Sequence, residues 1–115
     1  MNPLITDEER ARLLANGQAR AAGQDTDPLP VVRLFTPDAH VTWLLSELDP
    51  IDGDTSFGLI DLGIGLPALG TVKLSDLAGI VGPNKQPVMR DGYFQATRPL
   101  SEYVRLAQEN GSITD

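Results

Sequence analysis

The fold is decided by the stretch Val41-Thr42-Trp43-Leu44-Leu45-Ser46-Glu47-Leu48-Asp49-Pro50-Ile51-Asp52-Gly53-Asp54-Thr55-Ser56-Phe57-Gly58-Leu59-Ile60-Asp61-Leu62. Its two outer parts, 41–48 and 55–62, are rich in the β-branched and aromatic residues that favour strands. The acidic centre, 49–54, contains an Asp-Gly step, which tolerates the positive φ that hairpin turns need. The stretch therefore predicts an antiparallel hairpin.

Two further strands flank this hairpin. Val31–Phe35 precedes it and ends in the turn residues Thr36-Pro37, and Leu69–Lys73 follows the break at 63–67. Each connection is too short for a helical crossover, so the strands form an antiparallel meander of about four strands. Residues 88–94 are expected to be partly extended.

Helices are expected at both ends of the chain. Thr6 and Glu9 have the spacing of a capping box, which predicts a helix over 7–16 that stops at Asn16-Gly17. Residues 17–30 are expected to be a loop, with an extension of the helix over 18–22 as the alternative. At the other end, apolar residues at helical spacing predict a helix that Gly111 terminates. They are Leu100, Tyr103, Val104 and Ala107.

A short internal helix is expected over 74–80, with Ser75 as its cap. The fold class is therefore α+β, in a single domain over 1–115: a small antiparallel meander sheet of about four strands. An N-terminal helix, a C-terminal helix and the short internal helix pack on it.

The strand over 41–48 is apolar on both faces: one face has Val41, Trp43 and Leu45, and the other has Leu44 and Leu48. A strand of this kind is usually covered on both sides. The terminal helices provide one cover, and a second copy of the chain in a homodimer is one way to provide the other.

Composition excludes several classes of function. The chain has no cysteine, which excludes disulfides and thiolate metal sites, and only one histidine. Its pI near 4.5 argues against direct binding of nucleic acid, which needs clustered Lys and Arg. Because no signal peptide and no apolar run of membrane-spanning length is present, we expect a cytoplasmic protein without a membrane role.

The negative charge is concentrated in one segment. Residues 34–72 hold six of the 16 Asp and Glu residues and none of the nine Lys and Arg residues. Four of the six gather at the hairpin end and form the candidate binding surface: Glu47, Asp49, Asp52 and Asp54. The alternative is that they are solvated turn residues, since charge clusters are most often solvated. The spacing does not fit a calcium loop, and we expect no metal and no cofactor.

Secondary candidates lie elsewhere: Asp38, His40, Asp61 and Arg90. A histidine beside a carboxylate can act as a general base, but no nucleophile motif accompanies His40. Arg90 can anchor a carboxylate, including one from the hairpin, while Tyr93 and Phe94 are expected to pack under the last helix. No residue is assigned a catalytic role.

Several runs together resemble the bacterial family catalogued as domain of unknown function 2958. They are Phe35-Thr36-Pro37-Asp38, Thr42-Trp43-Leu44-Leu45, Glu47-Leu48-Asp49-Pro50, Phe57-Gly58-Leu59, Asp61-Leu62-Gly63, Leu69-Gly70, Leu74–Leu77, Arg90-Asp91, Tyr93-Phe94 and Pro99-Leu100-Ser101. The resemblance implies a plasmid-related, mobile-element context and no particular activity. The chain departs from the family pattern at Ala68 and Met89, where acids are common, and at Thr71, where Tyr is common.

Three hypotheses of function follow. The first is a non-enzymatic interaction protein that presents an acidic surface to a basic or nucleic-acid-handling partner, with an anti-restriction or anti-CRISPR type inhibitor as its sharpest form. The second in rank is a structural or accessory domain whose acidity maintains solubility. The third is a small carboxylate-based enzyme or metal-binding protein, which requires Glu47, Asp49, Asp61 and His40 to converge.

Overall fold

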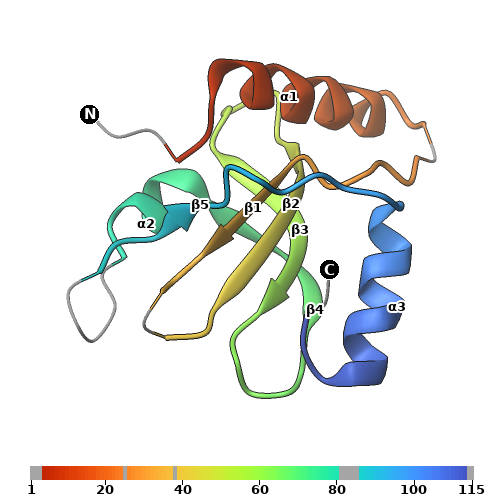
Figure 1. The fold of residues 1–115 in the computed structure, drawn as a ribbon. Helices are drawn as coiled ribbons and strands as arrows, with labels where there is room; N and C mark the ends of the chain where they lie inside the picture. The colour runs from red at the N-terminus through yellow and green to blue at the C-terminus, as the bar shows by residue number, and fades with distance from the viewer. Residues whose placement is uncertain (1–3, 25, 38, 81–85, 114–115) are drawn as a thin grey trace.

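In the part of the chain that the computed structural model describes, three helices surround a five-stranded antiparallel sheet (Figure 1). The structure describes residues 4–24, 26–37, 39–80 and 86–113. The elements in chain order are α1 (Asp7–Ala21), β1 (Val32–Phe35), β2 (Thr42–Leu48), β3 (Thr55–Asp61), β4 (Ala68–Lys73), α2 (Leu74–Ala78), β5 (Met89–Arg90) and α3 (Leu100–Asn110).

The sheet has the strand order β4-β3-β2-β1-β5, and every neighbouring pair is antiparallel. This confirms the α+β class and the meander over β1 to β4. The fifth strand, β5, adds one to the expected count of about four. It pairs with β1 through Leu34↔Arg90 and Phe35↔Met89, within the segment expected to be partly extended.

A β-bulge interrupts the pairing of β2 with β3. Leu45 pairs with Gly58 but Glu47 pairs with Phe57, so Ser46 is the extra residue. An extra residue reverses the alternation of side chains beyond it. Leu48 therefore joins Leu45 on one face of the sheet, and the expectation that Leu48 shares a face with Leu44 is wrong.

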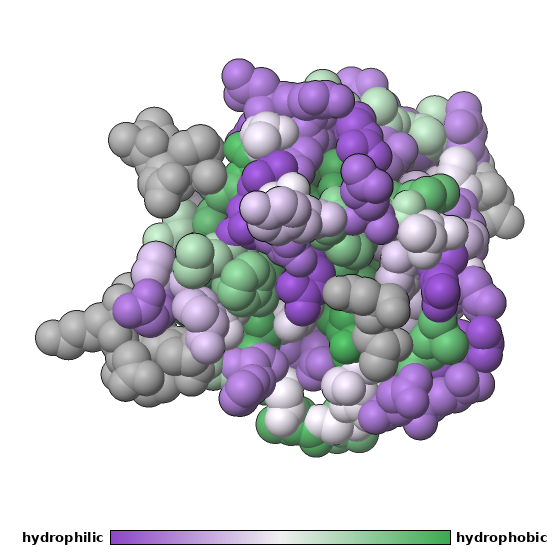
Figure 2. Space-filling view, in the orientation of Figure 1, coloured by the Kyte–Doolittle hydropathy of each residue, from purple (hydrophilic) through white to green (hydrophobic). Residues whose placement is uncertain are grey.

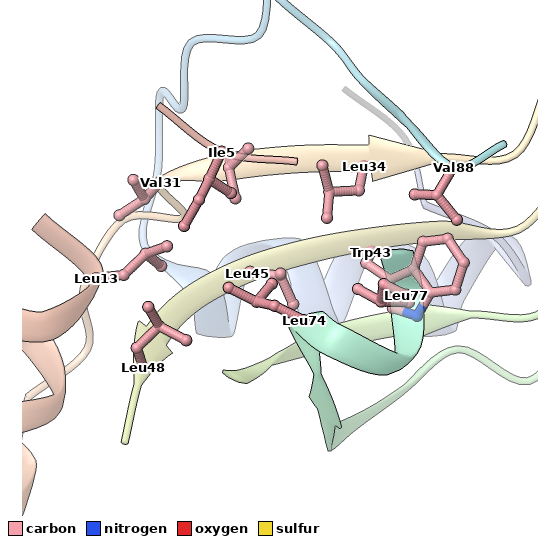
Figure 3. Close-up of a cluster of buried hydrophobic side chains, with 11 residues drawn as sticks. Ile5, Leu13, Val31, Leu34, Trp43, Leu45, Leu48, Leu74, Leu77 and Val88 are labelled. Atoms are coloured by element: carbon pink, nitrogen blue, oxygen red, sulfur yellow. The ribbon is translucent and has the colours of Figure 1, made fainter. Parts of the chain in front are cut away.

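The larger core cluster lies between the sheet and the helices α1 and α2 (Figure 3). Leu45 and Leu48 of β2 meet Leu13 of α1 and Leu77 of α2, and all four side chains are fully buried. Fully burying one such side chain contributes about 2 kcal/mol. This cluster fixes the positions of α1 and α2 on the sheet.

The opposite face of the sheet is covered by α3. Leu44 and Leu59 pack there against Leu100, Tyr103 and Ala107, which form the expected apolar stripe. The second cover of β2 is therefore supplied by the chain itself, so the apolar character of both faces does not call for a partner chain.

The helix α1 runs to Ala21, so the expected stop at Asn16-Gly17 is wrong. The alternative, an extension of the helix over 18–22, is confirmed up to residue 21. The capping box of Thr6 and Glu9 is confirmed. Gly17 lies inside the helix, at the point where the helix backbone comes closest to the end of β2, and only a residue without a side chain fits there. A Cβ atom at this position would lie 1.8 Å from the carbonyl oxygen of Leu48.

Replacing Gly17 by alanine is expected to destabilise the fold. In an exposed helix this change stabilises by about 1 kcal/mol, but here the new methyl group meets rigid backbone, and overpacking of this kind costs about 1–3 kcal/mol. We predict that Gly17→Ala lowers the free energy of unfolding by about 2 kcal/mol, measured by urea denaturation.

The matched control lies on the exposed side of the same helix. Ala15 is exposed, so Ala15→Gly should lower stability by about 1 kcal/mol through helix propensity alone. Alanine is thus preferred at 15 and glycine at 17. A Gly17→Ala variant as stable as the parent protein would contradict the close approach of α1 to β2.

Candidate binding groove at the hairpin end of the sheet

A groove of about 390 Å³ opens where the last turns of α1 meet the β2–β3 hairpin. The helix crosses this end of the sheet (Figure 1). Most of the groove is apolar, and two carboxylates and one guanidinium stand in its wall. The lining residues are Gly17, Arg20, Ala21, Glu47, Leu48, Asp49, Pro50, Ile51, Thr55, Ser56, Phe57 and Thr71.

A buried carboxylate and a half-exposed arginine form one wall of the groove. The Glu47 side chain is only 4% exposed and lies 2.7 Å from Nε of Arg20, whose side chain is 55% exposed. The guanidinium of Arg20 also lies over the Phe57 ring, 4.8 Å from its centroid. Leaving a buried carboxylate unpaired is costly, so Arg20 is the residue that permits Glu47 to be buried.

Asp49 and Ile51 form the rim of the groove. Oδ1 of Asp49 accepts a hydrogen bond from the amide of Ile51 at 2.9 Å, and the Asp49 carbonyl accepts one from the Gly53 amide at 2.8 Å. These bonds close the turn and leave the Ile51 side chain 93% exposed. Glu47 and Asp49 both line the groove, but β2 ends at Leu48, so Asp49 belongs to the turn and not to the strand.

Asp52 organises the turn itself. Oδ1 accepts from the amides of Thr55 and Asp54 at 2.9 Å, and Oδ2 accepts from the Thr55 hydroxyl at 2.7 Å. The pKa of Asp52 is lowered to about 2. The main cause is the hydrogen bond from the Thr55 amide, and the next is the one from the Asp54 amide. Asp52 is outside the groove lining and stays ionised at any physiological pH.

Asp54 connects the hairpin to α2. Its carboxylate accepts from the amide of Ser75 at 2.9 Å and from its hydroxyl at 2.6 Å, and its carbonyl accepts from the Leu74 amide. The expectation that Ser75 caps α2 is therefore wrong: the N-cap position is Lys73, and Ser75 binds Asp54 instead.

Basic residues from other segments come to the hairpin. Nη1 of Arg10 donates to the Gly53 carbonyl at 2.8 Å, Arg20 pairs with Glu47, and the charge of Lys73 contributes to the low pKa of Asp52. A run without any base in the sequence thus has three bases beside it in the fold. Sequence reasoning missed Arg20, because its partner is 27 residues away.

The remaining acidic candidates lie elsewhere. Asp61, at the other end of β3, is buried and accepts from the amides of Gly63 and Ile113. His40 is exposed, has φ 56° and lies beside Gly63. Asp38 lies outside the described residues. Glu47 and Asp49 are at the opposite end of the ladder, so the convergence that the enzymatic hypothesis requires is not found.

Arg90 pairs with α1 rather than with the hairpin. Its Nε donates to both carboxylate oxygens of Glu9, at 2.8 and 3.1 Å, and its Nη2 donates to Oε2 at 2.9 Å. Burial raises the pKa of Glu9, but the hydrogen bonds from Arg90 and Thr6 outweigh it, so the net pKa is lowered. Of the two aromatics, Phe94 packs against Tyr103 of α3 as expected, whereas Tyr93 is 97% exposed, contrary to expectation.

The surface around α1 is mainly hydrophilic, and exposed hydrophobic residues gather instead in the β3–β4 loop (Figure 2). Ile64 and Leu66 of that loop are 68% and 75% exposed. Among the described ranges, no three His, Asp or Glu side chains come close enough together to hold a metal ion. No helix in this part of the chain has the length and apolar character that crossing a bilayer demands.

These features define an antiparallel α+β protein with a groove between its first helix and its central hairpin. The chain belongs to the family described as "Protein of unknown function (DUF2958)", whose model matches residues 4–114. No curated protein and no solved structure matches the chain. The resemblance seen in the sequence is therefore confirmed, and the family description names no activity.

The low pKa of Asp52 predicts how the stability of the fold depends on pH. Because the folded-state pKa, about 2, is below the ordinary value of 3.8, the ionised carboxylate stabilises the fold above pH 3.8, and this contribution is lost as pH falls through 2. Asp52→Ala should therefore be less stable than the parent at neutral pH, and the difference should shrink between about pH 4 and 2.

The pKa itself is measured by following the Asp52 carboxyl carbon by NMR during an acid titration. A midpoint near pH 2 is expected. A midpoint at the ordinary value of 3.8 would contradict the hydrogen bonds assigned to this carboxylate.

Proposed function

We propose that the chain is a non-enzymatic interaction protein whose contact surface is the hairpin end of the sheet. The observation that carries the proposal is the setting of Ile51, a 93% exposed apolar side chain flanked by Asp49 and Asp52. Protein interfaces commonly combine an apolar centre with a polar rim. Asp54 extends the acidic rim, and Glu47 lines the groove beneath it.

The carboxylates of this surface are held before any partner arrives. The hydrogen bonds to Asp49, Asp52 and Asp54 come from the turn and from α2, so the groups need little further ordering on binding. Because the pKa of Asp52 is low, this carboxylate is negatively charged at physiological pH. A fixed negative surface speeds encounter with a positive one, in a salt-dependent manner.

The partner best suited to this surface is a basic protein. Enzymes that handle nucleic acid carry clustered Lys and Arg for phosphate contacts, and an acidic hairpin competes for the same groups. An inhibitor of the anti-restriction or anti-CRISPR type is the sharpest form of the proposal. The plasmid-related context that the family resemblance implies supports this form.

One observation favours a second candidate, a structural or accessory domain. Asp52 and Asp54 are both engaged in holding the turn and α2, which is sufficient reason for their presence. Under this alternative, replacing the hairpin acids changes stability and leaves any association of the protein unaffected.

A pull-down with the full chain separates the two. We expect capture of a basic or DNA-handling partner at low ionic strength, weakened at high ionic strength, and an affinity about tenfold lower for the triple variant Asp49→Asn, Asp52→Asn, Asp54→Asn. Asparagine keeps an acceptor oxygen for the turn, so circular dichroism should show a folded variant.

The matched control is Asp7→Asn, Glu8→Gln, Glu109→Gln, which changes the net charge equally at exposed helix positions. It should bind the partner nearly as well as the parent protein does. Binding that is retained by the hairpin variant, or that falls equally in both triple variants, would contradict a specific acidic contact surface.

A further inference from the structure

We infer that the groove receives an arginine side chain of the partner, with its guanidinium against Asp49 and its methylene stem on the apolar lining. The inference rests on the proposed function and specifies where on the hairpin end the basic partner is anchored. Three features of the groove carry it: the charge balance of its wall, the contacts already made by Arg20, and its apolar lining.

The charge balance of the groove leaves one negative charge. Of the residues that the structure describes, its lining contains two carboxylates, Glu47 and Asp49, and one base, Arg20. Nε of Arg20 lies 2.9 Å from Oε1 and 2.7 Å from Oε2 of Glu47, so this carboxylate is engaged. Asp49 uses Oδ1 for the Ile51 amide. Within the described residues its Oδ2 accepts no hydrogen bond, and it is the acceptor that remains for an incoming cation.

Arg20 shows the chemistry that this wall accommodates. Its guanidinium pairs with a carboxylate on one side and lies over the ring of Phe57 on the other. An aromatic ring and a carboxylate together form a favourable setting for a guanidinium, because the ring face attracts the cation and the carboxylate takes its N–H groups. Asp49 is a second carboxylate in the same lining as Phe57, so the groove offers a further cation the same two types of group.

The apolar lining suits the stem of an arginine. Pro50 and Ile51 give the hairpin side of the groove an accessible apolar surface. Its volume of about 390 Å³ is of the size of a small ligand site. Long basic side chains lay their methylenes on such surfaces while the charged head reaches a polar group. Arginine is preferred over lysine because its planar head stacks on rings and bridges to a carboxylate through a fork of donors.

The test is an NMR titration of the isotope-labelled full chain with a short glycine peptide that carries one arginine. Control peptides carry citrulline, norleucine or lysine at the same position. We expect saturable shifts of the amides of Gly17, Thr55 and Thr71 with the arginine peptide. The citrulline and norleucine peptides, which have no charge, should bind about tenfold more weakly.

Two variants locate the contact. Asp49→Asn should weaken binding of the arginine peptide about tenfold. Glu8→Gln removes the same charge at an exposed position near the start of α1, outside both the groove lining and the hairpin surface, and should change binding less than about twofold. Matching spectra of the free proteins verify that both variants are folded.

Three outcomes would overturn the inference: equal binding of the norleucine peptide, binding by lysine as tight as by arginine, or equal effects of the two variants. If a basic partner is captured through the hairpin acids but the arginine peptide leaves the groove amides unmoved, the inference fails and the proposed function stands. If the peptide binds in the groove as described but no basic partner exists, the inference about the groove is supported and the proposed function fails.

Discussion

The contact of α1 with the end of β2 is the constraint on which the rest of the site depends. Gly17 brings the helix against the carbonyl of Leu48, where any side chain would collide with the backbone. At this distance Nδ2 of the Asn16 side chain donates to the Ser46 carbonyl, and Arg20 reaches Glu47. The groove exists because the helix is held this close along its last turns and leaves the hairpin beyond it uncovered.

The bulge at Ser46 determines what the helix meets there. If Ser46 were paired in a regular strand without the bulge, Leu48 would leave the core that it shares with Leu13, and Glu47 would point toward the apolar side of α1. With it, Leu48 is fully buried and Glu47 stands opposite Phe57 on the other face. A charged residue near the end of a buried strand is therefore accommodated by one shift of register and one arginine, and the same arrangement gives the groove its polar wall.

Much of the fold could be predicted from the sequence because it depends on local chemistry. The hairpin, its acidic turn, the capping box of Thr6 and the stripe of α3 all follow from residues within a few positions of one another. The site depends on distant pairs: Arg20 with Glu47 across 27 residues, and Arg90 with Glu9 across 81. The helix end predicted at Asn16-Gly17 was wrong for a related reason. A glycine after an asparagine usually ends a helix, whereas Gly17 is needed for the close contact of α1 with Leu48. The local patterns located the acids but not the bases that the fold places beside them.

The most direct test of this account is a double-mutant cycle on the ion pair between Arg20 and Glu47. Urea denaturation of the parent protein, Arg20→Met, Glu47→Gln and the double variant gives the coupling energy between the two side chains. Because the carboxylate is buried and pairs with this arginine, the predicted coupling is about 1–3 kcal/mol, with Arg20→Met the more harmful single change. Single effects that add within about 0.3 kcal/mol would mean that α1 and the hairpin are not joined by this pair, and would contradict the account.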